Sequence, residues 1–502
     1  MNIGLLSDMV ADGLGDRVVI GARDSGITAA RLRALSTAGA AVITGLGADA
    51  VVYLAVNGPA FPVALFAAAR AGVPLVPVNY RLGREQLESI LANHPGAVFI
   101  ADPVPSAPVP PAAARVFTPD EWLATLAAGD ATPAGDRDSD APAVIIYTSG
   151  TTSAPKGVLL RHENLTSYVL GTVEFGAAEP TDAALVSVPP YHIAAVANTL
   201  TNLYAGRRMM VLEHFTPEQW LATVRAEKIS NALVVPTMLA RIIESPADKS
   251  VPSLRGLAYG GAPMPSRLIE RALRQWPDVG FVNAYGLTET SSTVAVLGPE
   301  DHRAALAGAD PRVRARLASA GRAVPGVEIE IRDADDNLLG AGEPGRICVA
   351  GEQVSAEYAG IGRLVDERGF FDTRDKGYLD EDGYLFIGGR IDDTIIRGAE
   401  NIAPAEIEDV ILRHPAVLDV AVVGVPDEVW GQRIEAVVVL RPGTAPDAEA
   451  LRSYVRDTLR SSKTPDRILF WDQVPRTETG KLIRRTVRDR LITGGEPAAV
   501  PS

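Results

Sequence analysis

The chain has 502 residues, of which 47% are hydrophobic and 22% charged, and its formal net charge is −14. This length exceeds one ordinary hydrophobic core, so we expect at least two domains, and the composition is typical of a folded globular protein rather than a disordered one. The negative charge, with no stripe of lysine and arginine to offset it, argues against a nucleic-acid partner.

Cysteine content and apolar runs bear on where the protein works. The single cysteine, Cys348, excludes a disulfide framework and fits a reducing cytoplasm, and its apolar neighbours predict a buried strand. The N-terminus lacks a basic start followed by an apolar stretch, so no secretory signal is visible. Residues 50–72 are apolar but interrupted by prolines and by Arg70, which predicts a strand and a packed helix. We expect a cytoplasmic protein with no integral membrane segment.

Residues 15–100 alternate strand-like and helix-like patterns. A strand is predicted at residues 51–56, and helices are predicted at 61–70 and 84–92. Such alternation indicates a layered α/β domain with parallel strands. The stretch at 102–141, which is rich in proline, alanine and aspartate, is expected to cross the surface.

Residues 147–157, Tyr-Thr-Ser-Gly-Thr-Thr-Ser-Ala-Pro-Lys-Gly, lie between two strand-like apolar runs. Glycine lets the backbone approach a ligand, hydroxyls donate hydrogen bonds and lysine brings a positive charge, so the segment suits a polyphosphate. The alternative is a flexible surface loop, against which the flanking strands and the Pro-Lys-Gly ending argue. The segment is not a Walker loop, because Lys156 is followed by glycine and valine rather than by serine or threonine.

Strand-like runs continue through residues 180–300. They are predicted at 183–188, 208–212, 232–235, 256–259 and 280–283. Several end at glycine or proline, which suits strand ends beside a binding crevice.

The last of these strands runs into Asn283-Ala-Tyr-Gly-Leu-Thr-Glu-Thr290. Tyr285 is suited to covering a purine, Thr288 to donating to a phosphate and Glu289 to holding Mg²⁺. An ordinary strand-to-loop segment is the alternative, but the phosphate-binding segment upstream favours a nucleotide site.

Residues 327–331 alternate apolar and acidic side chains, turn through an aspartate-rich stretch and return at 345–349. This pattern predicts a hairpin with one solvated face. The turn is similar in composition to a calcium loop, but Leu338 and Pro344 stand where that loop needs glycine and glutamate, so we reject calcium there.

A second domain is predicted to start near Arg390, where glycines cluster and the pattern changes to short strands and a helix at 404–413. Asp375 and Arg390 offer an acceptor and a donor suited to ribose, with two solvated surface turns as the alternative. A glycine turn singles out Lys481, whereas most exposed lysines have no specific function. The six histidines show no metal-ligand spacing, and His192 is expected in the core or in a pocket wall.

Taken in order, these segments resemble the acyl-adenylate-forming superfamily of acyl- and aryl-CoA ligases, peptide-synthetase adenylation domains and luciferases. The match rests on Tyr-Thr-Ser-Gly-Thr-Thr, Tyr-Gly-Leu-Thr-Glu, Gly-Arg-Ile-Asp-Asp and Thr-Gly-Lys in register. The resemblance implies an α/β fold with a large N-terminal domain of several sheets, layered α/β with a distorted barrel, at residues 1–389. It also implies a small mobile α+β C-terminal domain at 390–502 that rotates about a hinge at Asp392.

The resemblance implies an ATP-dependent acid–CoA ligase. A carboxylate attacks the ATP α-phosphorus to give an acyl-adenylate and pyrophosphate, and the thiolate of CoA then attacks the acyl carbon. Lys481, Thr288 and Glu289 are the implied catalytic residues, and Glu289 and Thr151 are the implied Mg²⁺ ligands. The implied ATP-binding residues are Thr148, Ser149, Gly150, Thr151, Thr152, Lys156, Gly261, Ala262, Pro263, Asn283, Ala284, Tyr285, Gly286, Thr288, Asp375, Ile387, Arg390 and Lys481.

The substrate class follows from one position. Amino-acid-activating domains carry an aspartate where this chain has His192 and Ile193, so an α-amino acid would lack its counter-charge and a free acid without an amine is expected. Small residues, among them Ala195 and Ala197, suggest room for a fatty, branched or alicyclic acid. The implied acid pocket consists of His192, Ile193, Ala194, Gly260, Gly286 and Ser291. The implied CoA-binding residues are Gly398, Ala399, Glu400 and Trp430.

Three residues depart from the family pattern, because Ser153, Arg374 and Ala399 stand where glycine is usual. A positive φ would cost about 1 kcal/mol at Ser153 or at Ala399. Ala399 leaves open an acyl-AMP ligase that delivers its acyl group to a carrier protein instead of CoA. A non-catalytic adenylate-binding protein, the remote alternative, would require the loss of Lys481, Glu289 or Asp375. The implied partners are the small-molecule acid, ATP and CoA, with a homodimer left open.

Overall fold

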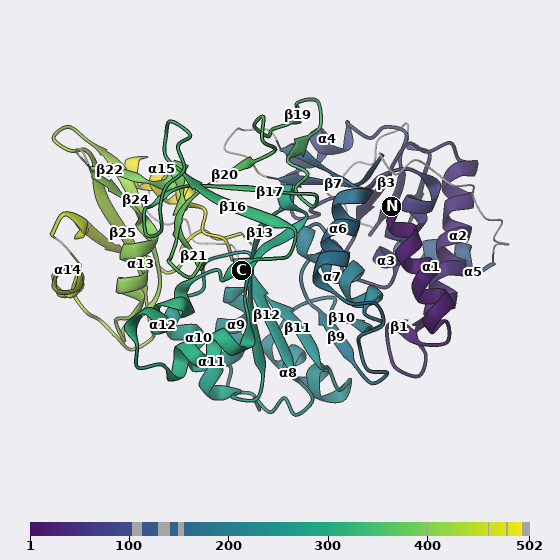
Figure 1. The fold of residues 1–502 in the computed structure, drawn as a ribbon, viewed down its shortest axis with the longest axis horizontal. Helices are drawn as coiled ribbons and strands as arrows, with labels where there is room; N and C mark the ends of the chain where they lie inside the picture. Colours follow the sequence, from purple (N-terminus) through teal and green to yellow (C-terminus); the bar gives the residue numbers. More distant parts are fainter. Residues whose placement is uncertain are drawn as a thin grey trace.

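The computed structural model describes residues 1–102, 113–128, 141–148, 155–397, 400–459, 461–477 and 480–493. Three large sheets with surrounding helices make up the larger part of the molecule, and a smaller part, coloured yellow-green in Figure 1, follows at the C-terminal end. None of the described helices combines the length and the apolar character that a membrane span requires.

The first sheet carries the predicted phosphate loop. Its strands follow the spatial order β19 (Gly362–Arg363), β18 (Glu357–Tyr358), β8 (Lys156–Arg161), β7 (Pro142–Thr148), β4 (Leu75–Pro77), β3 (Val51–Leu54), β5 (Val98–Ala101) and β6 (Arg115–Phe117). From β7 to β6 the neighbouring strands are parallel, as the alternating pattern predicted. β7 and β8 are antiparallel and flank the loop.

The second sheet carries the predicted nucleotide motif. Its strands follow the order β15 (Arg322–Ala323), β14 (Ser292–Leu297), β13 (Gly280–Leu287), β12 (Gly256–Gly260), β11 (Asn231–Val234), β9 (Ala183–Val186), β10 (Arg208–Val211), β1 (Val18–Ile20) and β2 (Ile27–Thr28). The five strands predicted between residues 180 and 300 are therefore confirmed as β9 to β13. β13 extends past its predicted end at Asn283 because β14 pairs with it antiparallel as far as Leu287.

Helices cover the faces of these two sheets (Figure 1). α3 is buried at every residue except Arg70, and a Cβ added to Gly39 of α2 would lie 2.6 Å from Ala67, so these two helices pack closely through small residues. The helices of the larger part are α1 (Ile3–Leu14), α2 (Ala29–Gly45), α3 (Ala60–Ala71), α4 (Arg84–Leu91), α5 (Pro119–Ala128), α6 (His162–Thr172), α7 (Ile193–Tyr204), α8 (Pro217–Ala226), α9 (Pro236–Glu244), α10 (Ser266–Gln275), η1 (Thr288–Thr290), α11 (Pro299–Ala307), α12 (Pro311–Ala315) and η2 (Arg316–Ala318).

The third sheet is antiparallel, in the order β16 (Val327–Arg332), β17 (Gly345–Gly351), β20 (Phe371–Leu379) and β21 (Leu385–Arg390). The predicted hairpin is confirmed, with Val327 of β16 opposite Gly351 of β17. Cys348 is buried in β17, and this burial raises the pKa of its thiol to about 11. The cysteine is thus an unreactive core residue, as its neighbours predicted.

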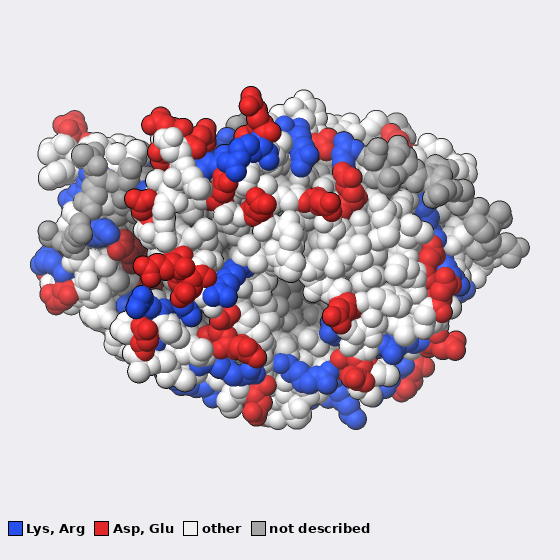
Figure 2. All heavy atoms as spheres, viewed as in Figure 1, with Lys and Arg blue, Asp and Glu red and all other residues white. Residues whose placement is uncertain are grey.

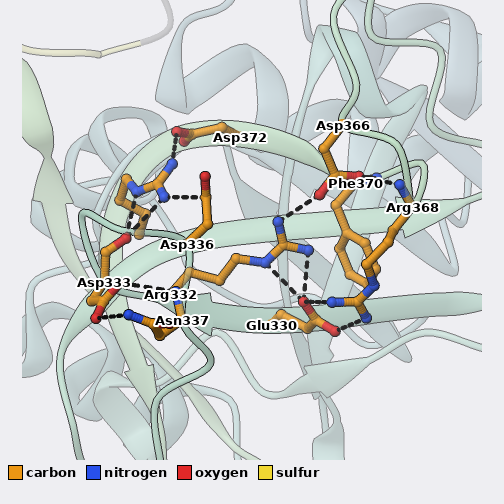
Figure 3. A network of polar contacts seen from close by, with 10 residues as sticks. Glu330, Arg332, Asp333, Asp336, Asn337, Asp366, Arg368, Phe370 and Asp372 are labelled. Atoms are coloured by element: carbon orange, nitrogen blue, oxygen red, sulfur yellow. Dashed lines mark hydrogen bonds and ion pairs between the residues drawn. The ribbon is translucent and has the colours of Figure 1, made fainter.

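Ion pairs fasten the outer turns of this sheet (Figure 3). Arg332 pairs with Glu330 at 2.7 Å and with Asp366 at 2.6 Å, and Arg368 reaches Glu330 at 2.5 Å. Both guanidinium groups lie over the ring of Phe370, with their central carbons 4.6 and 4.9 Å from its centroid. The loop before β20 is therefore tied to β16.

The aspartate-rich turn of the hairpin is held by its own side chains (Figure 3). Asp333 accepts hydrogen bonds from the backbone and the side-chain amide of Asn337 at 2.9 and 3.0 Å. Arg346 contacts Asp336 and pairs with Asp372 of β20 at 2.8 Å. These carboxylates hold the turn against the sheet.

The smaller part is built on a separate sheet. Its elements are η3 (Ile391–Asp393), β22 (Ile395–Arg397), β23 (Glu400–Ile402), α13 (Pro404–Leu412), β24 (Val417–Asp427), β25 (Gly431–Leu440), α14 (Ala448–Thr458), η4 (Ser461–Lys463), β26 (Arg467–Phe470) and α15 (Arg484–Thr493). β24, β25 and β26 form the sheet, with α13 and α14 on one face and α15 on the other. The helix predicted at 404–413 is confirmed as α13.

The predicted fold class is confirmed: mixed sheets with helices form a large α/β part, and a smaller α+β part follows. The predicted boundary between residues 389 and 390 falls at the end of β21, one residue before η3. That division into two domains stays a prediction.

Candidate active site

The segment predicted to bind the nucleotide lies where β13 turns back into β14. The turn is tight, because a Cβ placed on Gly286 would lie 1.6 Å from the carbonyl oxygen of Ser292, so only glycine fits there. Ser291 and Ser292 have φ values of 53° and 102°, in the left-handed region that residues with side chains rarely adopt. This turn, with its two left-handed residues, holds η1, and with it Thr288, in a fixed position relative to the second sheet.

A buried carboxylate links β13 to β20 and β21. Asp375 is 6% exposed, and its Oδ2 accepts a hydrogen bond from the Tyr285 hydroxyl at 2.6 Å. Arg390, opposite Asp375 in the strand register, lies 3.2 Å from its Oδ1 and also donates to the carbonyl oxygen of Thr373. The structure thus brings together the two residues predicted for ribose and the tyrosine predicted for the purine.

Burial and charge shift the acidity of this cluster. Burial raises the pKa of the Asp375 carboxyl, while Arg390, the Tyr285 hydroxyl and Lys481 act in the opposite direction. Burial, followed by the charge of Asp375, raises the pKa of Tyr285 well above its ordinary value. Tyr285 therefore keeps its proton and remains a hydrogen-bond donor to the carboxylate.

Arg374 is a departure from the family pattern whose backbone the structure describes. Its φ is 59°, and its N–H donates to Oδ1 of Asp372 at 2.8 Å. This left-handed conformation explains why glycine suits the position, and it costs a residue with a side chain roughly 1 kcal/mol.

Lys481 stands on a short turn of the smaller part. Thr477 holds this turn, because its N–H donates to the carbonyl oxygen of Lys481 at 2.8 Å and its hydroxyl accepts from the Lys481 N–H at 3.0 Å. Arg476 donates to the carbonyl oxygen of Gly480 at 2.7 Å and pairs with Asp419 at 2.6 Å. Contacts within the smaller part therefore fix the backbone position of Lys481.

The Lys481 side chain reaches the site formed by the larger part. The residue as a whole is exposed, yet the protein around its ammonium group desolvates it and, together with the charge of Arg390, lowers its pKa. The carboxylates of Asp375, Asp393 and Glu289 act on the ammonium in the opposite direction. Residues predicted from separate motifs thus meet at one site.

The turn that carries Lys481 rests on the start of α9. A Cβ added to Gly480 would lie 2.5 Å from the side chain of Thr237, and the φ of Gly480 is 79°. Glycine is required here for both its left-handed backbone and its close approach to a neighbour.

β12 and β13 bring the two segments predicted for adenine side by side. Gly260 lies opposite Ala284, and a Cβ on Gly260 would come within 2.3 Å of the Ala284 carbonyl oxygen. Gly261, with a φ of 79°, starts the loop through Ala262 and Pro263 toward α10. The end of β12 and the segment 283–285 of β13 therefore lie next to each other.

Two other residues predicted for ATP lie on strands of different sheets. Asn283 of β13 donates through its side-chain amide to the carbonyl oxygen of Ser319 at 3.0 Å. Ile387 of β21 packs against the same hydrophobic cluster as Tyr285. Tyr285 of the second sheet and Ile387 of the third sheet therefore pack in one hydrophobic cluster.

Only the flanks of the predicted phosphate loop are described. Thr148 of β7 lies opposite Lys156 of β8, so the hairpin opens at these two residues. The Tyr147 hydroxyl lies 2.9 Å from Nε2 of His94 at the base of the loop. The predicted residues Ser149, Gly150, Thr151 and Thr152, and the departure Ser153, lie outside the described residues.

Comparison with known proteins decides the family. A protein-family model described as "AMP-binding enzyme" matches residues 8–359, and one described as "AMP-binding enzyme C-terminal domain" matches residues 406–481. The chain belongs to the AMP-binding enzyme family.

Two curated relatives in this family act on different acceptors. The fatty acid–[acyl-carrier-protein] ligase ScoC of Streptomyces coeruleorubidus is 35% identical over 465 residues, covering 88% of this chain and 87% of that protein. The feruloyl-CoA synthase of Amycolatopsis sp. is 35% identical over 457 residues, covering 88% of this chain and 89% of that protein. The chain is accordingly an AMP-forming acid–thiol ligase, as the sequence predicted.

Solved structures of AMP-binding enzymes share the fold. ATP-bound MatB from Rhodopseudomonas palustris has a TM-score of 0.87 at 27% identity, covering 97% of this chain and 99% of that one. The O-succinylbenzoate coenzyme A synthetase of Bacillus subtilis, in complex with ATP and magnesium ion, has a TM-score of 0.82 at 27% identity, covering 96% and 99%. Enzymes of this family use ATP and Mg²⁺, with CoA as co-substrate.

The donor set at Glu289 fits a magnesium ion. Oε1 of Glu289 accepts a hydrogen bond from the Tyr358 hydroxyl at 2.8 Å, and no described residue donates to Oε2. Among the described residues no cluster of three or more His, Cys, Asp or Glu side chains is placed to hold a metal. Mg²⁺ in ATP-dependent enzymes is typically held by one or two carboxylates and the substrate phosphates, which this single carboxylate suits.

The residues predicted for the acid pocket come from α7, β12, β13 and the turn between η1 and β14. His192 stands at the N-cap position of α7, whose first turn contains Ile193 and Ala194, and its ring centroid lies 4.8 Å from that of Tyr191. Ser291 is fully buried, and its hydroxyl has no hydrogen-bond partner among the described residues. Gly260 and Gly286 lie on β12 and β13.

The residues predicted for CoA are only partly described. Gly398 and Ala399 lie outside the described residues, and Glu400 is placed as the start of β23 without its side chain. Trp430 is 49% exposed between β24 and β25, where the guanidinium carbon of Arg397 lies 5.2 Å from its ring centroid. The predicted hinge Asp392 lies in η3, between the third sheet and β22.

Sequence reasoning missed the residues that support the site. Tyr358 contacts Glu289 from 69 positions along the chain, and Thr237 contacts the Lys481 turn from a different part of the molecule. Arg484 pairs with Asp393, next to the predicted hinge, at 3.1 Å. None of them stands in a motif of its own, so only their three-dimensional neighbours identify them.

Proposed function

We propose that this chain activates a carboxylic acid as acyl-AMP with release of pyrophosphate and then transfers the acyl group to CoA. The observation that carries this proposal is that the turn carrying Lys481 rests on Thr237 of the larger part, with the ammonium group in the electrostatic field of Asp375, Arg390 and Glu289. A carboxylate and ATP are both anions, and their reaction needs positive charge placed where negative charge concentrates. Lys481 brings that charge to the nucleotide motif from the smaller part.

The proposed nucleotide position follows the strand ends. Residues 261–263 and 283–285 enclose adenine in this proposal, which is supported by the pairing of Gly260, just before the first segment, with Ala284 of the second. Asp375 accepts from the ribose hydroxyls and is held for this by Arg390 and Tyr285. The opening at Thr148 and Lys156 and the loop between them take the pyrophosphate portion.

In the first half-reaction, a carboxylate oxygen of the acid bonds to the α-phosphorus and the bond to the bridging oxygen of pyrophosphate breaks. The Lys481 ammonium stabilises the charge that develops on the phosphoryl oxygens, and Thr288 donates a hydrogen bond to the α-phosphate. Mg²⁺, held by Glu289 and Thr151, supplies charge neutralisation on the phosphates when bound.

In the second half-reaction, the thiolate sulfur of CoA bonds to the acyl carbon, the bond from that carbon to the phosphate oxygen breaks, and AMP leaves with that oxygen. We propose that the smaller part rotates on the larger part about Asp392, withdrawing Lys481 and presenting the segment 398–401, with Trp430 beside the thiol-bearing arm of the entering CoA. η3 suits a hinge because it is a short helical turn between two strands of separate sheets.

The proposed acid lacks an α-amino group and is fatty, branched or alicyclic. His192 at the start of α7 provides no carboxylate for a substrate ammonium, and an unpaired ammonium in an apolar pocket would be costly. The small side chains Ala194, Ala195 and Ala197 on the same helix leave room for an apolar acyl group.

Delivery to a carrier protein is the second candidate. Its support is the similarity to the acyl-carrier-protein ligase ScoC, which is as high as the similarity to a CoA ligase. Ala399, in the segment proposed for thiolation, also departs from the glycine that is usual there.

A screen of pyrophosphate release tests both candidates. Fatty, aromatic and alicyclic acids are each supplied with ATP and Mg²⁺, with and without CoA, and the acyl product is identified by mass spectrometry. Acyl-CoA formation from an apolar acid is expected. Turnover that stops at acyl-AMP despite CoA would favour the carrier protein, and no turnover with any acid would overturn the proposal.

A further inference from the structure

The segment from Gln353 to Tyr358 forms several hydrogen bonds to the turn that carries Glu289. The side-chain amide of Gln353 donates to the carbonyl oxygens of Thr290 and Thr293 at 3.0 and 2.8 Å. The N–H of Ala356 donates to the carbonyl oxygen of Glu289 at 2.9 Å. The Tyr358 hydroxyl completes this set by donating to Oε1 of the Glu289 side chain at 2.8 Å.

This segment is itself fixed to β8, the strand that leaves the phosphate loop. Tyr358 lies opposite Val158 in the register of β18 and β8. Arg161 of β8 forms a two-pronged ion pair with Glu357, with both contacts at 2.8 Å. Ser355 also donates to a backbone carbonyl of β8. Tyr358 therefore reaches Glu289 from a rigid support.

We infer that Tyr358 is a positioning residue for the metal-binding carboxylate Glu289. This inference rests on the proposed function, in which Glu289 binds Mg²⁺. The hydrogen bond from Tyr358 occupies Oε1 and holds the carboxylate in one rotamer, so Oε2 is the oxygen presented to the cation. Outer partners of this kind fix the orientation of ligating side chains and are a large part of metal affinity.

The hydroxyl and the ring of Tyr358 make different contacts, so a substitution can remove one and keep the other. The ring packs against the large hydrophobic cluster that the first two sheets share with their helices, whereas the hydroxyl reaches Glu289. Tyr358→Phe keeps the ring and removes only the hydrogen bond. Tyr384→Phe is a matched control, because its hydroxyl also donates to a carboxylate, that of Asp301, at 2.6 Å.

The first measurement is metal binding by the full chain. Mn²⁺ replaces Mg²⁺, an ATP analogue with a methylene bridge between the α- and β-phosphates prevents turnover, and electron paramagnetic resonance reports free Mn²⁺. Tyr358→Phe should raise the Mn²⁺ dissociation constant about tenfold, in the range that loss of an outer partner typically produces. Tyr384→Phe should leave it unchanged. An unchanged constant in Tyr358→Phe would overturn the inference.

A second variant separates this inference from the proposed function. Glu289→Gln should itself weaken Mn²⁺ binding, and adding Tyr358→Phe to it should bring no further loss, because the two residues act through one carboxylate. If Glu289→Gln leaves Mn²⁺ binding intact, the proposed metal ligand is wrong. If Glu289→Gln weakens binding but Tyr358→Phe does not, only the positioning role is wrong.

Discussion

Two cationic side chains act at the proposed reaction centre, and they differ in which part of the molecule holds them. Arg390 is held against Asp375 within the third sheet, whereas Lys481 comes from a turn on the other part of the molecule. Only Lys481 can leave the site without disturbing the residues proposed for ribose. This difference suits a lysine that serves one half-reaction and is absent from the other.

Lys481→Ala should therefore separate the two half-reactions. We expect acyl-AMP formation to fall by at least about a hundredfold, the usual cost of removing a group that stabilises transition-state charge. Thiolysis of acyl-AMP supplied preformed should stay close to the original rate. Single-turnover assays of pyrophosphate release and of acyl-CoA formation measure the two steps. Equal loss of both steps would contradict the proposed withdrawal of the lysine.

The pKa shifts predict the pH profile of acyl-AMP formation. Burial, followed by the charge of Arg390, lowers the pKa of Lys481, so the lysine loses its proton at a lower pH than an ordinary lysine does. Pyrophosphate release without CoA should therefore decline as pH rises through this lowered pKa. Burial raises the pKa of Asp375, so ATP binding should weaken as pH falls, beginning at a higher pH than for an ordinary aspartate.

Lys481→Arg provides the test of this assignment, because arginine stays charged across the whole accessible range. The variant should be slower, but the alkaline decline should move to higher pH. An alkaline decline at the same pH in both proteins would show that another group titrates.

The sequence predicted most of the strands, helices and turns that depend on local patterns of residues. The strands β9 to β13, the helix α13 and the hairpin of β16 and β17 all follow from periodicity and turn residues. The support of the site did not follow, because hydrogen bonds such as that from Tyr358 to Glu289 join segments that no sequence period relates. Roles such as those of Thr237 and Arg484 arise only from packing between elements.

The turn that carries Lys481 illustrates this limit. The sequence marks Gly480 as a turn glycine, and its φ of 79° agrees, but only the structure shows that it also faces Thr237. Gly443 offers a comparison on the same part of the molecule, with a φ of 78° and nothing within 4 Å of an added Cβ. The two glycines share a backbone requirement and differ in their neighbours.

Gly480→Ala should impair acyl-AMP formation beyond its cost in stability. Gly480→Ala and Gly443→Ala should both lower the free energy of unfolding by roughly 1 kcal/mol, because both force a side chain into the left-handed region. Only Gly480→Ala should slow pyrophosphate release, since its Cβ overlaps Thr237 and displaces the lysine. Adding Thr237→Gly should restore part of that rate. Equal rates in the two glycine variants would rule out docking on Thr237.

Polar contacts join the two parts of the molecule. Arg441 at the end of β25 pairs with Glu244 at the end of α9 at 2.9 Å, and Arg271 of α10 lies 3.6 Å from the same carboxylate. The Ser266 hydroxyl lies 3.5 Å from Asp409 of α13, which Figure 1 shows near α10. Pairs as exposed as these contribute about 0–1 kcal/mol each, so the docked arrangement is held loosely enough to open.

Arg441→Gln should shift the balance between the two half-reactions. Losing one exposed ion pair should slow acyl-AMP formation by about two- to fivefold, the kinetic equivalent of up to ~1 kcal/mol, while thiolysis of preformed acyl-AMP is unchanged or faster. High salt should slow acyl-AMP formation less in Arg441→Gln than in the original protein, because the screened contact is already gone. Arg84→Gln removes an exposed pair with Glu88, at 2.8 Å within α4, and should change neither step. Slowing of both half-reactions alike by Arg441→Gln would show that the contact supports the fold rather than the docked arrangement.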